Sequence, residues 1–378
     1  MDWLTHAERL ATELVRPESR WRSPLATTAR HLLVPRWWES AGDGRYVARD
    51  GAADPEAWMH ATYANDTLVT RVGPLHADHA EPGQTTEGRP TSSSTLPVLV
   101  VGMYRHAMVT DTSRVLVTTG SGYGTALLCR RLGADRVTSI DVDPYLVEAA
   151  GNRLDAMGLR PHMGVGDITD ILPGEFDRIV STVSVRPVPA AMLAALRPGG
   201  RLVTTLAGTG LIVVADKTAD GSAVGHVPQD RAGFMRTRHG DDYAPRATDA
   251  LWEKTKEADG EEVTTSRYPL LYPPDAWDVW SMLELTIPGI DYRKAAEGDR
   301  RTVWMLHEDG SWARAEAPGF LDSPTVHQAG PRRLWDELER IRHRLNREGA
   351  LPVYGARVRI DPDGTVRLSR GAWSVTVT

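Results

Sequence analysis

Cysteine is almost absent from this 378-residue sequence, in which Cys129 is the single example. One thiol excludes an internal disulfide and a zinc cluster built from cysteines. Long apolar runs are missing too, so no stretch is typical of a membrane span. Residues 1–20 carry charges throughout and lack the apolar core of a signal peptide. We therefore expect a cytoplasmic protein without a membrane partner.

An excess of positive charge is also lacking. The chain has 44 Lys and Arg against 50 Asp and Glu, which gives a formal net charge of −6 and a pI near 6.1. Such a chain is not built to neutralise a phosphate backbone, so nucleic acid is not expected as a partner. The length is too great for one average domain and predicts two units.

Residues 91–211 alternate short β-branched runs with helical segments, and this alternation predicts βαβ units on a parallel sheet. We therefore expect a doubly wound, Rossmann-like α/β core over residues 91–238. Residues 1–90 are mixed and turn-rich, with an amphipathic opening helix, and are predicted to form a helical and loop cover. The stretch 76–94, "HADHAEPGQTTEGRPTSSS", reads as loop.

The C-terminal residues 239–378 lack clear alternation and are predicted to form an α+β accessory domain that recognises a peptide. A helix is predicted in "RRLWDELERIRHRLNREG", because five apolar residues share one face, namely Leu334, Trp335, Leu338, Ile341 and Leu345. Two hairpins are predicted, one turning at Asp220-Gly221 and one in "VRIDPDGTVRLS".

A glycine-containing turn joins the first core strand to its helix. The strand "RVLVT" runs into "TGSGYG", and the next strand ends at Asp141, 21 residues after Gly120. An acid at this distance is where a ribose hydroxyl pair would be bound, and the glycines let a backbone approach a ligand closely. The alternative is a tight strand-to-helix turn that binds nothing.

Several segments together resemble the protein-L-isoaspartate O-methyltransferases, which use S-adenosylmethionine. The segments are "HLLVPRWW", "RPTSSSTLPVLVVGMY", "TGSGYGTALLCRRLG", "VTSIDVDPYLVEAAGNRL", "VGDITD", "FDRIVSTVSVRPVP" and "LRPGGRLV". The chain further resembles the branch of this family that is encoded beside ribosomally made peptides, the lanthipeptides and graspetides, on "GSAVGHVPQDRAGFMRTR" and "LWDELERIRHRL".

The resemblance implies a class I methyltransferase fold, S-adenosylmethionine as cofactor and S-adenosylhomocysteine as product. It implies cofactor contacts from Thr119, Gly120, Ser121, Gly122, Tyr123, Asp141, Val142, Gly166, Asp167, Ile168 and Thr182, and catalytic hydroxyls from Ser93, Ser94 and Thr95. Two positions depart from the family. Leu116 replaces an acid and Thr118 replaces the first glycine, which predicts a looser hold on the amino-acid end of the cofactor.

Methyl transfer to a carboxylate asks for alignment and exclusion of water, since the carboxylate is already ionised at neutral pH. Short hydroxyls orient it without the ion pair that a lysine would form. The alternative for Ser93, Ser94 and Thr95 is a polar loop in which Thr95 caps the following helix.

Other candidates have simpler interpretations. His76 and His79 lack a third ligand nearby, so no metal is expected. Cys129 is expected in the core, and Asp141 has the alternative of closing a strand turn. Several tryptophans form either a peptide groove or ordinary core, namely Trp37, Trp38, Trp277, Trp280, Trp304, Trp312 and Trp335.

Three functions stay open on the sequence alone. The first is a monomeric enzyme that methylates an aspartate in a modified, macrocyclic precursor peptide and so leads to succinimide or isoaspartate. The second is a repair methyltransferase for isoaspartyl damage. The third is a non-catalytic module that keeps the fold, a possibility raised by Leu116 and Thr118.

Overall fold

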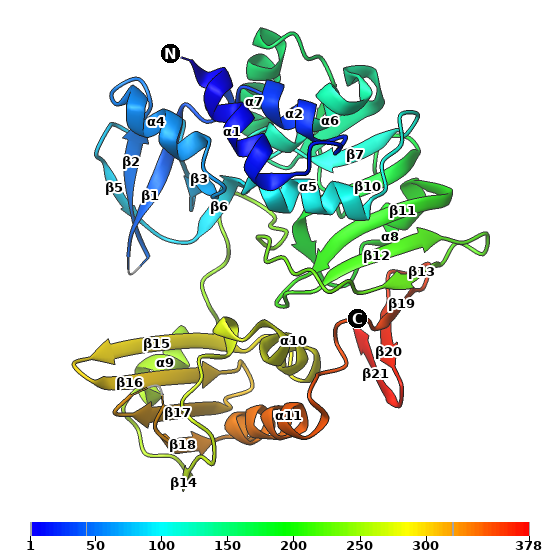
Figure 1. The fold of residues 1–378 in the computed structure, drawn as a ribbon. Helices are drawn as coiled ribbons and strands as arrows, with labels where there is room; N and C mark the ends of the chain where they lie inside the picture. Colours follow the sequence, from blue (N-terminus) through cyan, green and yellow to red (C-terminus); the bar gives the residue numbers. More distant parts are fainter. Residues whose placement is uncertain (1, 43, 320, 378) are drawn as a thin grey trace.

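The structure is a computed structural model that describes residues 2–42, 44–319 and 321–377. Within these ranges the strands form three sheets, and the largest has the order β21-β20-β19-β13-β12-β11-β10-β7-β8-β9 (Figure 1). A second sheet belongs to the N-terminal region and a third to the C-terminal region. Across the same residues no helix has the length and hydropathy that a membrane span requires.

Parallel strands connected by helices form the centre of the molecule, and they confirm the predicted doubly wound α/β core. The strands are β7 (Val115–Thr118), β8 (Val137–Asp141), β9 (His162–Val165), β10 (Phe176–Val185) and β11 (Leu196–Leu206), and the helices are α5 (Pro97–His106), α6 (Tyr123–Leu132), α7 (Pro144–Ala156) and α8 (Ala190–Ala195), with η2 (Ala134–Arg136) after α6. The predicted hairpin at Asp220-Gly221 follows as antiparallel β12 (Ile212–Lys217) and β13 (Ala223–His226).

The two faces of this sheet bury different residues of the same strand. Val115 and Val117 pack with α5 and α6, where Cys129 is also buried as predicted. Leu116 points to the opposite face and is fully buried in the apolar core that also contains residues of α8 and of the helices after residue 270. Alternation along a strand therefore places Leu116 in an apolar core, where an ionised acid would be unfavourable.

The N-terminal region contains a sheet that the sequence did not predict. Helices are present, as expected, at α1 (Trp3–Leu14), α2 (Arg22–Thr27), α3 (Arg30–Leu33) and α4 (Pro55–Thr62), but the strands β1 (Arg36–Gly42), β2 (Arg45–Asp50) and β3 (Leu68–Val72) lie between and after them. The strand order is β4-β3-β1-β2-β5, and β6 also pairs with β3. The cover is thus a sheet as well as helices.

The prediction of a loop over residues 76–94 was wrong. This stretch contains η1 (Ala77–His79), β5 (Thr85–Glu87) and β6 (Pro90–Ser94), and β4 (Leu75–His76) ends within it. The β6 strand is held by antiparallel pairing with β3 and by a 3.0 Å hydrogen bond between the hydroxyls of Thr70 and Ser92. Long-range pairing overrides the turn-like composition of the segment.

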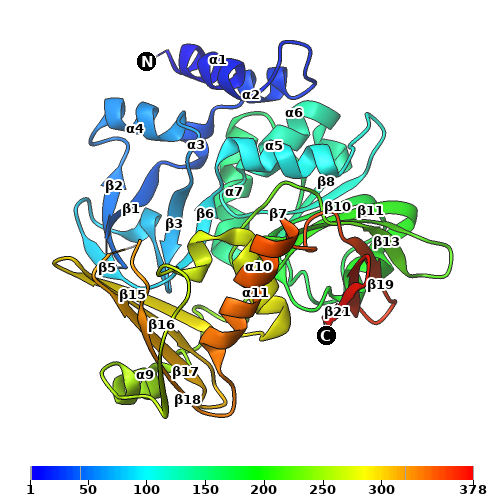
Figure 2. The same cartoon turned by 60° about the horizontal axis from the view of Figure 1, so that its bottom comes forward.

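The C-terminal region has a five-stranded sheet with helices packed on it. The elements are α9 (Asp249–Thr255), β14 (Glu262–Thr265), η3 (Pro273–Asp275), α10 (Trp277–Thr286), β15 (Asp291–Glu297), β16 (Arg300–Leu306), β17 (Trp312–Ala317), β18 (Thr325–Ala329) and α11 (Leu334–Glu348). Figure 2 shows α10 and α11 beside this sheet, where they share one apolar core with the ten-stranded sheet. The predicted helix α11 is confirmed, with its apolar face buried except for Leu345, which packs at the edge.

The last strands return to the ten-stranded sheet. The predicted hairpin forms as β19 (Arg357–Ile360) and β20 (Val366–Arg370), β21 (Trp373–Val377) follows, and β19 pairs with β13. Val227 and Ala356 are hydrogen bonded at 2.9 Å, where the chain leaves and re-enters this sheet. Residues 239–378 therefore contribute to two sheets.

Candidate functional site

A cavity of about 190 Å³ lies at the carboxyl ends of β7, β8 and β10. Its lining combines the glycine turn, the ends of β8, β9 and β10, the strand β6 with the start of α5, and a segment after β13 that we call the strap, residues 233–241. The lining residues include Thr67, Thr91, Ser92, Ser93, Thr95, Leu96, Leu99, Thr118, Gly120, Asp141, Val142, Gly166, Asp167, Ile168 and Thr182, together with strap residues 233–238. Carboxyl ends of parallel strands are where α/β sheets bind ligands.

The glycine turn approaches β6 closely. Gly120 has a φ of +51°, and a Cβ at this position would lie 3.1 Å from the carbonyl oxygen of Ser93. Glycine is thus favoured here both by the positive φ and by the limited space. Gly122, at φ +84°, has a different role, because its missing Cβ makes room for Ala150 on α7 and it does not line the cavity.

Asp141 points its carboxylate at the glycine turn, and it also closes the turn after β8, which is the alternative that the sequence left open. Its Oδ2 accepts a hydrogen bond from the N–H of Gly120 at 3.0 Å, and its Oδ1 accepts one from the N–H of Asp143 at 3.1 Å. Burial raises the pKa of Asp141 above the ordinary value of 3.8, and the two N–H donors oppose this. Each oxygen retains a lone pair that can accept a hydroxyl from a ligand in the cavity.

Hydroxyl groups gather where the main cavity meets a smaller one of about 30 Å³ behind the turn. Ser93, Thr95, Thr118 and Thr182 line both cavities, as does Gly120. The hydroxyls of Thr118 and Thr182 are 2.7 Å apart and bonded to one another. Thr118, which replaces the first glycine of the family pattern, therefore has its hydroxyl held against β10 by Thr182.

The remaining predicted residues divide into lining and supporting positions. Thr119, Ser121 and Tyr123 are buried and line the smaller cavity, and Thr119 is bonded to Ser139 at 2.7 Å. Asp167 lines the main cavity and contacts His239 of the strap at 2.9 Å. The structure thus brings these predicted side chains to one place.

Ser94 and Thr95 separate into different environments. Ser94 is buried, does not line the cavity, and accepts a hydrogen bond from the Nε of Arg30 at 3.3 Å. Thr95 lines the cavity. The residue that caps α5 is Leu96, which makes no side-chain capping bond, so the helix-cap alternative for Thr95 is not what the structure has.

The strap is the part of the site that sequence reasoning missed. It runs beside the end of β10, where the N–H of Ser184 donates to the carbonyl of Met235 at 2.7 Å and the N–H of Thr237 donates to the carbonyl of Ser184 at 3.0 Å. Phe234, Met235 and Arg238 are among its lining residues. No local pattern marks this segment, and the family-like string "GSAVGHVPQDRAGFMRTR" is the signal that pointed nearest to it.

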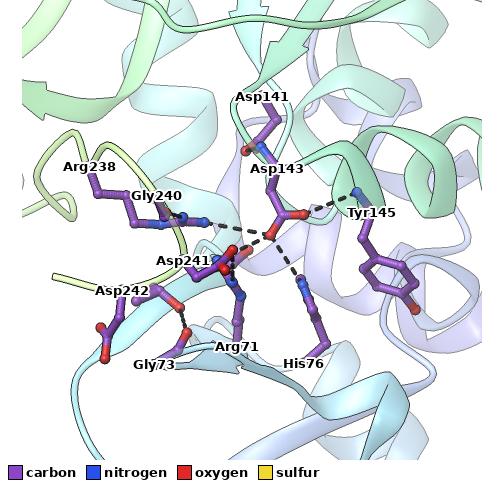
Figure 3. A network of polar contacts seen from close by, with 12 residues as sticks. Arg71, Gly73, His76, Asp141, Asp143, Tyr145, Arg238, Gly240, Asp241 and Asp242 are labelled. Carbon is purple, nitrogen blue, oxygen red and sulfur yellow. Dashed lines mark hydrogen bonds and ion pairs between the residues drawn. The ribbon is translucent and has the colours of Figure 1, made fainter.

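Ion pairs fasten the strap to the turn after β8 (Figure 3). The Oδ2 of Asp143 lies 3.2 Å from Arg71 of β3, 3.1 Å from His76 and 3.6 Å from Arg238 of the strap. Arg71 also contacts Asp241 at 3.4 Å. Burial opposes ionisation of Asp143, but the bond and charge of His76, with Arg71, outweigh it and hold its pKa at about 2. One carboxylate thus joins the N-terminal sheet, the core and the strap.

His76 is occupied by this ion pair. Across residues 2–42, 44–319 and 321–377, no group of three or more His, Cys, Asp and Glu side chains is arranged to hold a metal ion. His79 packs against the ring of Tyr145 with centroids 4.4 Å apart. These two histidines therefore act in packing and charge pairing.

Asp143→Asn should lower the free energy of unfolding by about 2 kcal/mol at pH 7, since the pKa lies nearly two units below its ordinary value. This stabilisation is present above the ordinary pKa and is lost as the pH falls toward 2. Denaturant titrations of both proteins between pH 7 and pH 3 should therefore show a difference that shrinks toward pH 3, where about half of it remains. Asp155→Asn, which removes an exposed pair with Arg160, is the control and should change little at any pH. An Asp143 effect that does not depend on pH would contradict the ion-pair explanation.

The tryptophans are mostly core. Trp37, Trp38, Trp312 and Trp335 are buried, whereas Trp277, Trp280 and Trp304 are partly exposed. Trp277 begins α10, and its ring lies so close to Gly210 that a Cβ there would clash with it, while a Cβ on the strap residue Gly233 would be 3.1 Å away. The C-terminal region therefore contacts the strap directly through an aromatic ring.

Comparison with known proteins gives consistent matches. The family profile described as Protein-L-isoaspartate(D-aspartate) O-methyltransferase (PCMT) matches residues 81–231. The chain is 36% identical over 200 residues to Protein-L-isoaspartate O-methyltransferase 1 of Anaeromyxobacter sp. (strain Fw109-5), covering 49% of this chain and 90% of that protein. It is 40% identical over 87 residues to Ribosomal protein L11 methyltransferase of Burkholderia mallei (strain NCTC 10229), covering 22% of this chain and 28% of that protein.

One solved structure matches almost end to end. It is that of a protein-L-isoaspartate O-methyltransferase, and it aligns with a TM-score of 0.50 and 16% identity, covering 99% of this chain and 98% of the other. At this identity the likeness concerns the fold. The fold is that of class I S-adenosylmethionine methyltransferases with additional C-terminal sheets.

Proposed function

Because the chain belongs to the protein-L-isoaspartate O-methyltransferase family, we propose that it methylates a carboxylate of an isoaspartyl or aspartyl residue, with S-adenosylmethionine as donor. The observation that carries the proposal is the junction of the two cavities. There the hydroxyl-bearing Ser93 and Thr95 of the β6 side meet the glycine turn of the core. The residues proposed to bind the methyl donor and those proposed to bind the acceptor carboxylate therefore lie side by side in one site.

The residues present fit S-adenosylmethionine. Gly120 would let the backbone approach it, Asp141 would accept the ribose hydroxyls, and Asp167 would flank the adenine. Thr118 and Thr182 would meet its amino-acid end with hydroxyls, since Leu116 is in the core. When bound, the cofactor supplies a sulfonium methyl group that needs no further activation.

The chain's own groups have a modest chemical task. The acceptor carboxylate is ionised at neutral pH, so no general base is required. Ser93 and Thr95 would donate hydrogen bonds that orient one carboxylate oxygen toward the methyl group. Leu96, Leu99 and the strap residue Phe234 would exclude water from the reacting atoms.

A dedicated substrate is the second candidate. The family match ends at residue 231, and we propose that residues 239–378 are an accessory region that reads the acceptor, with β19–β21 joined to the ten-stranded sheet. Contact between Trp277 of this region and the strap supports such a role, because the strap walls the cavity. The candidate acceptor is an aspartate in a modified, macrocyclic precursor peptide of the ribosomally synthesised class.

Methylation of such an aspartate leads to ring closure. The backbone nitrogen of the next residue attacks the ester carbonyl, the new C–N bond closes a five-membered succinimide, and methanol leaves with the amide proton. Glycine at that next position permits the closure most readily because it lacks a Cβ. Water then opens the ring to aspartate or isoaspartate.

The two candidates are separated by offering the enzyme three peptides with S-adenosylmethionine and following their masses. The three are an isoaspartyl peptide, a linear Asp-Gly peptide and the same Asp-Gly sequence in a macrocycle. Family membership leads us to expect the isoaspartyl peptide to gain one methyl group fastest. Faster reaction of the macrocycle, with later net loss of one water, would instead favour a dedicated macrocyclic peptide as the substrate. If none of the three gains a methyl group although the cofactor binds, the protein is a non-catalytic module and both proposals fail.

A further inference from the structure

A fully buried arginine lies behind the hydroxyl wall of the site. Arg30, the first residue of α3, has no exposed surface. Its Nε donates to the hydroxyl of Ser94 at 3.3 Å, its Nη1 to the carbonyls of Thr62 and Ala64 at 3.1 Å each, and its Nη2 to the carbonyls of Asp66, Ser94 and Thr95 at 2.8, 3.0 and 3.3 Å. All five N–H donors of the guanidinium are thereby used.

These partners are uncharged oxygens, and this is unusual for a buried cation. Burial lowers the pKa of Arg30 to about 10, so the guanidinium remains protonated at neutral pH. A buried charge is tolerated only where its hydrogen bonds are satisfied in good geometry. The carbonyls must therefore stay where they are for the cation to remain, and the cation fixes the carbonyls in return.

The same guanidinium reaches the cofactor side of the cavity. Its central carbon lies 5.0 Å from the ring centroid of Tyr123, the residue that follows the glycine turn and begins α6. The Tyr123 ring is buried and lines the smaller cavity together with Ser93 and Thr95. Arg30 thus contacts both the strand that carries the acceptor-side hydroxyls and the element that carries the cofactor turn.

Strand geometry explains how the contact between Arg30 and Ser94 fixes the position of Ser93, which lines the cavity. Successive side chains of a strand point to opposite faces, so a strand that holds Ser94 on Arg30 presents Ser93 to the cavity. Thr95 follows directly, with its carbonyl on Arg30 and its side chain at the cavity. Loss of the guanidinium would remove the contacts that join the end of β6 to Tyr123 at the start of α6.

We infer that Arg30 is a positioning residue for methyl transfer, which holds the hydroxyls of Ser93 and Thr95 in register with the cofactor turn without contacting either reactant. This inference rests on the proposed function for its kinetic consequence. Misplacement of aligned groups by about 1 Å lowers a rate by up to about a hundredfold. The effect should appear in turnover, while binding of the cofactor at Asp141 is retained.

The test compares Arg30→Met, Arg30→Lys and the control Arg201→Met. Arg201 is a hydrogen-bonded arginine as well, with the carboxylate of Asp216 and the carbonyl of His106 as acceptors, but it does not line the cavity. Arg30→Met should lower kcat between about tenfold and a hundredfold with the Kd for S-adenosylhomocysteine unchanged within about threefold. Arg30→Lys, which keeps the charge and three donors, should recover part of kcat. Arg201→Met should lower Tm and leave kcat unchanged.

Amide hydrogen exchange gives a readout that needs no activity. In Arg30→Lys, and in Arg30→Met if it folds, residues 91–95 and residues 120–124 should exchange faster together, because one side chain holds both. Unchanged kcat and exchange in a folded Arg30 variant would overturn the inference, as would faster exchange in one segment alone. A wild-type protein that transfers no methyl group refutes the proposed function, and exchange then still decides the role of Arg30.

Discussion

Asp141→Ala is expected to weaken binding of S-adenosylmethionine more than about a hundredfold. The carboxylate is held by the N–H groups of Gly120 and Asp143 with a lone pair left on each oxygen, which suits it to accept both ribose hydroxyls. A hydrogen bond to a charged group contributes about 1.5–3 kcal/mol, and about 1.4 kcal/mol is a tenfold change in affinity. Isothermal titration calorimetry with the cofactor measures the loss. Unchanged affinity in a folded variant would remove Asp141 from the site.

Two controls keep this result interpretable. Asp216→Ala breaks an ion pair with Arg201 on the same sheet away from the cavity, and should leave affinity unchanged. A pH series adds a second check. Burial raises the pKa of Asp141, and the ionised form is the acceptor, so affinity should fall with decreasing pH at values above the ordinary 3.8. The Asp141→Ala variant should lack this acid dependence.

Thr95→Ala is expected to lower kcat by about a hundredfold while cofactor affinity stays within about threefold. The hydroxyl lies where the two cavities meet, so its loss removes orientation of the acceptor in the chemical step. Since Leu96 is the capping residue of α5, no loss of a helix cap accompanies the change, and Tm should remain close to that of the wild type. Single-turnover kinetics with the best peptide measures the step.

Thr95→Ser provides the matched comparison, because it keeps the hydroxyl and removes one methyl group. Its turnover should be much nearer the wild type than that of Thr95→Ala. Equal turnover in wild type and Thr95→Ala would show that Ser93 or the backbone orients the acceptor alone. A drop in Tm without a drop in kcat would assign Thr95 to structure.

Local patterns predicted the core of the molecule, and they also singled out Gly120 and Asp141, which line the cavity. The alternation of strands and helices between residues 91 and 211, and the spacing from Gly120 to Asp141, depend on neighbours in the sequence, so they are visible without a structure. The separation of Ser93 from Ser94 follows from strand period, but only once β6 is known to be a strand. The composition of residues 76–94 concealed that, since β6 exists through its pairing with β3.

Contacts distant in sequence account for the rest. Arg71 and Asp143 come together from two sheets, and the strap meets Ser184 from fifty residues further along the chain. In both pairs, the sequence around one partner gives no indication of the other. The string "GSAVGHVPQDRAGFMRTR" contains most of the strap and drew attention to this part of the sequence. That the strap lines the cavity, however, depends on the path of the chain after β13.

Because β19 pairs with β13, residues 228–354 form an insertion between two neighbouring strands of the ten-stranded sheet, and this decides where the protein can be cut. A stop codon after α11 would remove β19–β21 and leave β13 as a bare sheet edge, which favours aggregation. The carbonyl of Val227 accepts a 2.8 Å hydrogen bond from Gly355, so the two ends of the insertion are already adjacent. A short turn joining them would keep the ten-stranded sheet intact. Replacing residues 228–354 by such a turn would also remove the strap, so the shortened protein would lack one wall of its cavity.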